Sequence, residues 1–483
     1  MDATMGGTLT AQMLPARAGV RGTSRGARAV VLPLLLVIAA LALGLALFPT
    51  PAAAGVADRI DEVLRSSGFG GSGTGIYVWD LDAALPVYGR NADTMLAPAS
   101  NLKLVTSAAA VFGWGFEHRF TTGLYAAGEP VDAQGTLFGD LYLVGRGDPS
   151  LSTRAYQKDT LEMKTASFET FARQVKRAGI RRIEGRVLGD ASWFDKLTTI
   201  PTWKNGLHLE CGPLSALSGD QGLEDGNRVA APATFAARLM TQALRKAGIT
   251  VEGKPGTGKL PESADLVDQQ YSASLRAVLK RMNKESDNFF AEMILKGLGK
   301  DHYGEGSTSV GTRASKDALH ALGVRTGTYV IQDGSGLSYG NRMTAQGLVK
   351  LLGAMRQRDD FEDFYDSLAI AGKDGTLRDR MRGTAAAGNA HAKTGTLNIA
   401  ICLSGYVTSA NDHLVAFAIL MNDDPIDWWR AMKAQDDIVV ALAKASLPGA
   451  TVLTVTPVLR QHSVSAREPV HGVGGGLKPG VQP

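Results

Sequence analysis

The sequence lacks a cysteine framework, a cluster of histidine and cysteine, and a basic stripe. Its 483 residues include only two cysteines, Cys211 and Cys402, which make neither a disulfide framework nor a metal site. The net charge of +4 is small for this length, and no basic run is interleaved with aromatic residues. Nothing therefore indicates binding to nucleic acid. We expect both cysteines to be buried as small apolar residues, although a bridge between them stays open.

Long hydrophobic runs are also scarce, and one stands out near the N-terminus, from Ala29 to Phe48. Arginines precede this run and Ala52–Ala54 follow it, as at the cleavage site of a signal peptide. The run is long for a signal core, so an uncleaved membrane anchor is the alternative. Whether it is a signal peptide or an anchor, the segment predicts that the rest of the chain is exported. We therefore expect the protein in the cell envelope, periplasmic or extracellular.

The pattern of the remaining chain predicts strands at both ends and helices between them. Before residue 118 we expect a helix, a hairpin and a second, apolar helix: 57–67, 74–82, 85–89 and the segment that starts near Ser100. Near the C-terminus we expect three strands and a long amphipathic helix. This order predicts one sheet that is completed by both ends of the chain and flanked by helices.

Residues 118–268 have a different sequence pattern, in which short predicted strands are separated by glycine and aspartate. We interpret this region as one or more inserted domains with a core of their own, packed beside a catalytic domain. The catalytic domain would comprise residues 55–117 and 269–461. A signal peptide or anchor would occupy 1–54, and the Gly-, Pro- and Val-rich residues 462–483 predict a disordered tail.

Three segments match known nucleotide-binding or catalytic motifs only in part. The G-x-G-x-x-G pattern over 68–73 precedes a strand, whereas a dinucleotide-binding loop follows one. Residues 253–260 nearly match a phosphate-binding loop but lack the hydroxyl residue that would hold Mg²⁺. GLSYG over 336–340 matches the nucleophile elbow of α/β-hydrolases, which keeps Ser338 as an alternative nucleophile.

A serine and a lysine lie three residues apart in APASNLKLV, where Ser100 and Lys103 start an apolar helix. Positions i and i+3 share a helix face, so the amine can reach the hydroxyl. A serine becomes a strong nucleophile when a base takes its proton, and burial lowers the pKa of a lysine enough for that role. Taken alone, the pair is better explained by a capping serine and a lysine whose end reaches solvent.

Two further motifs follow in the chain, Ser286-Asp287-Asn288 and Lys393-Thr394-Gly395. Taken singly, the first is explained by a helix cap and the second by an edge strand whose glycine permits close approach. S-x-x-K, S-D-N and K-T-G in this order are the motif set of serine enzymes that attack D-amino-acid amides or β-lactams. The combination predicts acyl transfer with Ser100 as the nucleophile.

The chain resembles the class C low-molecular-mass penicillin-binding proteins, the D-Ala-D-Ala carboxypeptidase/endopeptidase family. The resemblance runs from about residue 58 to 446 and is carried by DGSGLSYGNRMT, AGKDGTLRDRM and KTGTLNIAICLSGY. The segments GRGDPSL, GDASWFD and GPLSALS are similar to parts of the family's insertions. The insertion is shorter than in the fullest members, so one inserted subdomain is reduced or absent.

This resemblance implies an α/β (α+β) fold of the serine penicillin-recognising transpeptidase type, with an antiparallel sheet, flanking helices and an inserted strand-rich domain. Its catalytic residues would be Ser100, Lys103 and Ser286. Ser100 would form an acyl-enzyme, Lys103 would take its proton, and Ser286 would pass a proton to the leaving D-alanine. We expect Lys103 to be neutral, with its pKa lowered by burial and by a second ammonium nearby.

The resemblance also implies the substrate-binding residues. Asn288 would hydrogen-bond the peptide amide of the substrate. The strand around the third motif would recognise a terminal carboxylate through Lys393, Thr394, Gly395 and Thr396. We expect Lys393 to stay charged for this purpose. The backbone N–H groups of the nucleophile and of Thr396 would form the oxyanion hole.

The implied function is that of a serine-type D-Ala-D-Ala carboxypeptidase, or DD-endopeptidase, that acts on peptidoglycan stem peptides. β-Lactams would be its inhibitors, no metal or other cofactor is implied, and a retained N-terminal segment would contact the membrane. One alternative is a β-lactamase, although no class A glutamate motif lies between Ser286 and Lys393. The other is a catalytically idle module that binds the cell wall, although all motif residues are intact.

Overall fold

The computed structural model describes residues 51–129 and 131–448. The hydrophobic run from Ala29 to Phe48 and the predicted tail over 462–483 lie outside these residues. The predicted cleavage site, Ala52–Ala54, falls within helix α2 (Pro51–Ser67). Within the described ranges, no helix combines the length and the apolar character needed to cross a bilayer.

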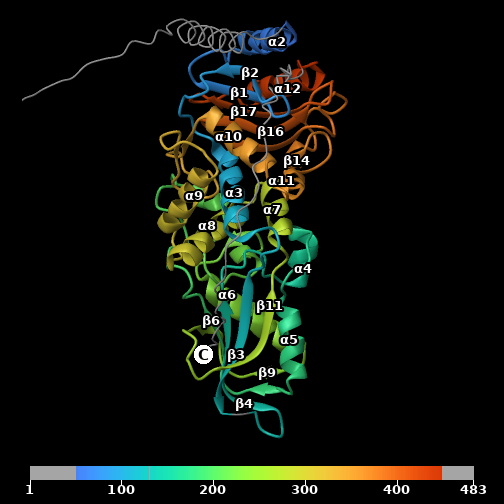
Figure 1. The fold of residues 1–483 in the computed structure, drawn as a ribbon. Helices are drawn as coiled ribbons and strands as arrows, with labels where there is room; N and C mark the ends of the chain where they lie inside the picture. Colours follow the sequence, from blue (N-terminus) through green and yellow to red (C-terminus); the bar gives the residue numbers. More distant parts are fainter. Residues whose placement is uncertain (1–50, 130, 449–483) are drawn as a thin grey trace, which may run out of the picture. The chain divides into compact units, whose positions relative to one another are not determined.

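A six-stranded antiparallel sheet lies at the centre of the catalytic part (Figure 1). Its strands, in spatial order, are β14 (Ala369–Ile370), β15 (His391–Leu397), β16 (Ala400–Thr408), β17 (Leu414–Asn422), β1 (Thr74–Asp80) and β2 (Leu85–Arg90). Strand β1, near the start of the chain, pairs with β17, near its end, and β2 pairs with β1. The prediction of one sheet completed by both chain ends is confirmed.

The two faces of this sheet are buried in different cores. Successive side chains of a strand point to opposite faces. Ile401 and Leu403 of β16 therefore join one core, and Cys402 and Tyr406 join the other. Helices α2 and α12 (Trp428–Lys444) cover the first face, which explains the amphipathic pattern of both helices.

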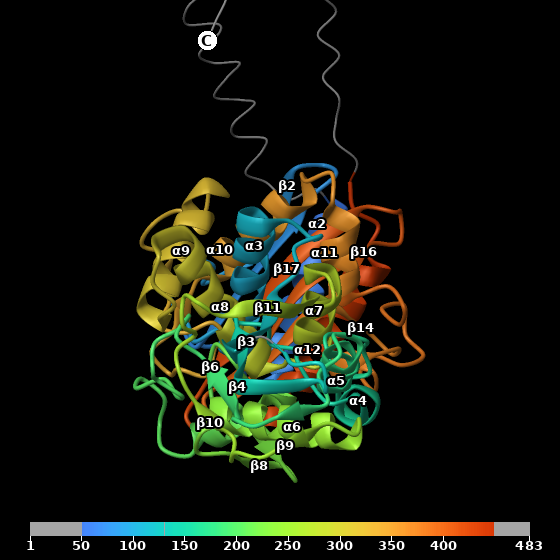
Figure 2. The ribbon, with the colours of Figure 1, turned by 90° about the horizontal axis from the view of Figure 1, so that it is seen from below.

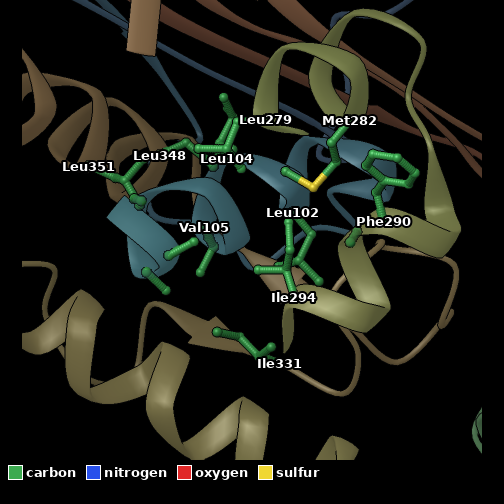
Figure 3. Close-up of a cluster of buried hydrophobic side chains, with 14 of the residues drawn as sticks. Leu102, Leu104, Val105, Leu279, Met282, Phe290, Ile294, Ile331, Leu348 and Leu351 are labelled. Atoms are coloured by element: carbon green, nitrogen blue, oxygen red, sulfur yellow. The ribbon is translucent and has the colours of Figure 1, made fainter. Parts of the chain in front are cut away.

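The second face of the sheet carries the remaining helices of the catalytic part. These are α3 (Leu102–Trp114), α7 (Leu275–Lys284), α8 (Asn288–Tyr303), α9 (Thr308–Ala321), α10 (Ala345–Arg356) and α11 (Phe361–Ser367). Helix α3 is apolar on every side and buried from Leu102 to Val111, as expected for a helix surrounded by others. Figure 3 shows Leu279, Phe290 and Leu348 among the side chains gathered around its first turns.

A second sheet belongs to the predicted insertion. Its main strands are β10 (Gly256–Thr257), β6 (Val187–Asp190), β4 (Thr136–Gly145), β3 (Thr121–Glu129) and β11 (Asp265–Tyr271), and β4 also pairs with β5 (Arg182–Ile183), which pairs with β9 (Thr250–Val251). Helices α5 (Phe168–Arg177) and α6 (Pro232–Lys246) share a core with this sheet (Figure 2). The structure thus contains the expected strand-rich region with its own core.

This insertion also contributes to the catalytic part. Phe194, Ile200, Trp203 and Leu214 are buried in the same core as helix α3. The sequence predicted that the region packs beside the catalytic domain but not that it shares this core. Short elements complete the described chain: α4 (Arg154–Tyr156), β7 (Leu223–Glu224), β8 (Asn227–Arg228), β12 (Tyr329–Val330) and β13 (Arg342–Met343).

The fold also decides the interpretation of the two cysteines and of the two glycine-rich motifs. Both cysteines are buried and free, so the disulfide between them is excluded. The glycine-rich residues 68–73 form the turn before β1. The partial motif over 253–260 contains the short strand β10 and no helix start, so it is no phosphate-binding loop.

The burial of α3 predicts which leucine stabilises the protein. Leu104 is fully buried, and Leu104→Ala should lower the free energy of unfolding by about 2–5 kcal/mol, because the cavity left behind closes only in part. Leu266→Ala, at a leucine that is 56% exposed, should change it by less than about 0.5 kcal/mol. Urea unfolding followed by circular dichroism measures both, and equal losses would contradict the packing described for α3.

Candidate active site

Ser100 lies in a 3₁₀ turn, Ala99–Asn101, that leads directly into α3. Two glycines let other segments approach this turn closely. A Cβ at Gly336 would overlap the carbonyl oxygen of Ala99, and a Cβ at Gly395 would lie 3.0 Å from Ser100 N. The turn that carries the serine is therefore enclosed between the loop at Gly336 and strand β15.

Lys103 is fully buried, and its amine has three hydrogen-bond partners. Nζ lies 2.9 Å from Ser100 Oγ, 2.7 Å from Asn288 Oδ1 and 2.7 Å from the carbonyl oxygen of Ser335. The last two oxygens can only accept, so they take both hydrogens of a neutral amine. The lone pair of that amine then faces the hydroxyl of Ser100, which is the geometry a general base requires.

The side chain of Asn288 is held in one orientation by the insertion. Its Nδ2 donates to the carbonyl oxygen of Glu210 at 2.8 Å, which turns Oδ1 toward Lys103. The preceding residue, Asp287, caps α8 by accepting a hydrogen bond from Phe290 N at 3.0 Å. The S-D-N motif is therefore a helix cap and also part of the site, as the sequence allowed.

Burial determines the proton affinity of Lys103. Loss of solvation lowers the pKa of its amine to about 8, although the carboxylates of Glu292, Asp333 and Asp287 oppose this change. The neutral form is therefore accessible near physiological pH, as a base requires. The sequence predicted the direction and the role of burial, but it did not predict the opposing carboxylates, and the expected second ammonium is not among the causes of the shift.

Lys393 is the second buried amine of the site. Its Nζ donates to Ser286 Oγ and to the carbonyl oxygen of Thr394, each at 2.9 Å. Burial, and then the charge of Lys103, hold the pKa of Lys393 well below its usual value. This direction opposes the expectation that Lys393 stays charged, because burial disfavours the ammonium; the charge itself stays a prediction.

The other residues of β15 lie along the strand beside Ser100. The side chain of Thr394 is half-buried and its Oγ1 lies 2.8 Å from Thr376 Oγ1, whereas the side chain of Thr396 is exposed. Ser286 has a φ of +59°, which is strained for a residue with a side chain. The structure therefore brings the three predicted segments together: Lys103 contacts Ser100 and Asn288, Lys393 contacts Ser286, and Gly395 lies against the serine turn.

The sequence missed a buried acidic group behind Lys103. Glu292 accepts hydrogen bonds from the backbone N–H groups of Gly334 and Ser335. Asp333, in the same loop, accepts from Trp203 Nε1 at 2.8 Å. A glutamate inside the apolar stretch NFFAEMIL was the available signal for this group.

The insertion also contacts the site in a way that the sequence did not indicate. Gln221 Nε2 donates to Asp287 Oδ2 at 2.7 Å, and the contact from Trp203 to the loop at Asp333 comes from the same region. Gln221 has a φ of +54° and follows Asp220, at +49°. Strained backbone of this kind persists only where surrounding contacts hold it, and here the contacts lead to the S-D-N motif.

The nucleophile-elbow alternative is excluded by the structure. Ser338 is fully buried, and its Oγ donates to Gln332 Oε1 at 2.5 Å. The downstream histidines are engaged elsewhere, since His413 Nδ1 lies 2.6 Å from Asp80 Oδ2 and the ring of His391 stacks on Tyr365. Within residues 51–129 and 131–448, no group of His, Cys, Asp and Glu is placed to hold a metal ion.

Sequence comparison places these features in a known context. The family model described as D-Ala-D-Ala carboxypeptidase 3 (S13) matches residues 56–222 and 216–445. A D-alanyl-D-alanine carboxypeptidase from Actinomadura sp. (strain R39) is 31% identical over 514 residues, covering 89% of this chain and 92% of the relative. Carboxypeptidase DacB from Mycolicibacterium smegmatis is 30% identical, covering 78% of this chain and 81% of the relative.

Solved structures show the same fold. Penicillin-binding protein 4 from Haemophilus influenzae matches with a TM-score of 0.68 and 23% identity, over 80% of this chain and 99% of that chain. The Bd3459 predatory endopeptidase from Bdellovibrio bacteriovorus matches with a TM-score of 0.52 and 22% identity, over 77% of this chain and 93% of that chain. The predicted fold class, with its antiparallel sheet, flanking helices and inserted strand-rich domain, is confirmed.

Proposed function

The chain belongs to the D-Ala-D-Ala carboxypeptidase 3 (S13) family, and on this premise we propose that Ser100 is the nucleophile of a serine-type D-Ala-D-Ala carboxypeptidase. One observation carries the proposal: a buried amine, Lys103, lies 2.9 Å from the serine hydroxyl, and fixed acceptors take its other two hydrogens. The substrates are peptidoglycan stem peptides, and β-lactams acylate the same serine.

Acylation follows from this geometry. As Ser100 Oγ forms a bond to the carbonyl carbon of the substrate, its proton passes to the neutral amine of Lys103. Ser286, which lies 2.9 Å from Lys393 Nζ, is the hydroxyl that relays a proton to the leaving D-alanine amine. The backbone N–H groups of Ser100 and Thr396 suit the oxyanion, since Gly395 lets β15 approach the serine turn.

Recognition of the substrate depends on the charge of the Lys393 amine. Burial lowers the pKa of its amine, whereas a carboxylate of the substrate beside it would raise that pKa, because opposite charges attract strongly where solvent is excluded. Thr394 and Thr396 supply hydroxyl donors beside that carboxylate. Asn288, which contacts Lys103, is the residue that hydrogen-bonds the peptide amide of the substrate. A free terminal carboxylate is the group that this arrangement selects.

Release of the acyl group by water completes the cycle. A β-lactamase needs a fast route for this step, such as the glutamate of the class A enzymes. Glu292 does not provide one, since both of its oxygens accept hydrogen bonds from the backbone of Gly334 and Ser335. The intact S-x-x-K geometry equally disfavours a catalytically idle module. The family and the site together favour the carboxypeptidase.

We place the enzyme in the cell envelope, where its substrate lies. The hydrophobic run from Ala29 to Phe48 supports export, either as a cleaved signal peptide or as a membrane anchor. An anchor would bring helix α2, which begins at Pro51, close to the membrane surface. Cleavage at Ala52–Ala54, near the start of α2, would release the enzyme instead.

The nucleophile can be tested on the substrate and on a β-lactam. The wild-type enzyme should remove one D-alanine from muropeptides that carry a pentapeptide stem, and a fluorescent penicillin should label it covalently. Ser100→Ala should abolish both, since no second nucleophile is placed to replace the hydroxyl. Mass spectrometry of the digested muropeptides and in-gel fluorescence give the two measurements.

Ser338→Ala is the matched control, because Ser338 is a buried serine from the competing motif. It should be labelled like the wild type. Labelling that survives Ser100→Ala but not Ser338→Ala would overturn the assignment of the nucleophile.

The two lysines should respond differently to replacement by arginine. The acylation rate of the wild type should rise as the pH passes through about 8, because only the neutral amine of Lys103 accepts a proton. Arginine stays protonated throughout this range, so Lys103→Arg should slow acylation at least about a hundredfold. Lys393→Arg keeps a cation with altered geometry, so binding should weaken while some acylation survives.

Single-turnover acylation by penicillin across a pH series measures both variants, with circular dichroism as the check on folding. Near-wild-type acylation by Lys103→Arg at neutral pH would contradict the role of Lys103 as the base.

A further inference from the structure

A buried carboxylate lies behind Lys103 and has no part in the chemistry described so far. Glu292 is in α8, one helical turn after Asn288, and is fully buried. Its oxygens accept from Gly334 N at 3.0 Å and from Ser335 N at 2.7 Å. The carbonyl oxygen of the same Ser335 accepts from Lys103 Nζ at 2.7 Å. Glu292 and Lys103 therefore both form hydrogen bonds with the backbone of one short loop.

A carboxylate is not needed merely to satisfy the N–H groups of Gly334 and Ser335. A buried peptide N–H needs one acceptor, and a backbone carbonyl or an amide side chain would suffice. A buried carboxylate is costly unless its charge is compensated. Here both oxygens act as acceptors, which is the arrangement of the ionised form, and the nearby cation is the amine of the site.

Several charged or titratable groups face Lys103 together with Glu292. They come from the loop, α8, the insertion and β15: Asp333, Asp287, Cys211 and Lys393. Asp333 has its own donors in Trp203 Nε1 and Asn341 Nδ2. Burial, and then Asp333, raise the pKa of Glu292, while Glu292 raises the pKa of Lys103 against the effect of burial.

We propose that Glu292 is a positioning residue for Lys103, which fixes the Gly334–Ser335 loop against the amine and supplies the counter-charge for the ammonium formed during acylation. The inference rests on the proposed role of Lys103 as the base. The proton of Ser100 moves to Nζ as the bond from Oγ to the carbonyl carbon forms, and it later leaves with the D-alanine amine. Glu292 itself exchanges no proton with the substrate.

The test separates charge from shape. Glu292→Gln keeps an acceptor oxygen for the loop but removes the charge. Without that charge the pKa of Lys103 falls, so the midpoint of the acylation rate against pH should move to lower pH. The plateau rate should also fall roughly tenfold, because a less basic amine is a weaker proton acceptor. Glu292→Asp keeps the charge and should retain the wild-type midpoint even if its rate is lower.

Asp148→Asn is the matched control, since Asp148 is also a buried carboxyl but lies in the insertion. Its midpoint should equal that of the wild type. A purely structural role for Glu292 predicts a lower rate in the Gln variant at every pH with an unchanged midpoint, and that result would overturn the proposal. If Glu292→Gln does not fold, a midpoint in Glu292→Asp lowered by about one pH unit or more would overturn it equally.

The proposed function and the role of Glu292 are refuted by different results. A wild-type protein that penicillin does not acylate at any pH would refute the proposed function. A wild-type protein that is acylated, combined with an unshifted Glu292→Gln variant, would refute only the role of Glu292.

Discussion

The buried amine of Lys103 is the constraint on which the site depends. A helix that is apolar on every side leaves this amine no route to solvent, and burying it without partners would cost several kcal/mol. Its partners must therefore come from elsewhere in the chain: Asn288 of α8 and the carbonyl oxygen of Ser335. Because these two acceptors take the two hydrogens of a neutral amine, its lone pair is directed toward Ser100. The three hydrogen-bond contacts of Nζ thus compensate for the burial of the amine and also orient it toward the serine hydroxyl.

The insertion is part of this arrangement and does not merely lie beside it. The carbonyl oxygen of Glu210 orients Asn288, Gln221 contacts the cap of α8, and Trp203 holds the loop at Asp333. A region without catalytic motifs therefore orients Asn288, which contacts Lys103, and holds the cap and the loop beside it. This dependence explains why side chains of the insertion are buried in the core of the catalytic part.

The sequence was most informative where chemistry or periodicity is local. The i, i+3 relation of Ser100 and Lys103, and the strands at both chain ends, were readable directly. Contacts between distant segments were not, because Glu210 acts through its backbone and Gln221 through a strained turn, and neither leaves a pattern in sequence. The burial of Lys393 was not readable for a related reason. The motif predicts a carboxylate-binding lysine, but only the structure shows that its side chain is fully buried.

The central claim is that a neutral Lys103 directs its lone pair at Ser100, and neutron diffraction tests it most directly. Crystals of the unliganded, deuterium-exchanged protein should be measured at about pH 9, above the pKa of about 8 to which burial lowers this amine. The account predicts two deuterons on Nζ, directed at Asn288 Oδ1 and at the carbonyl oxygen of Ser335, and a deuteron on Ser100 Oγ that points at Nζ. Three deuterons on Nζ, one of them directed at Ser100 Oγ, would contradict it.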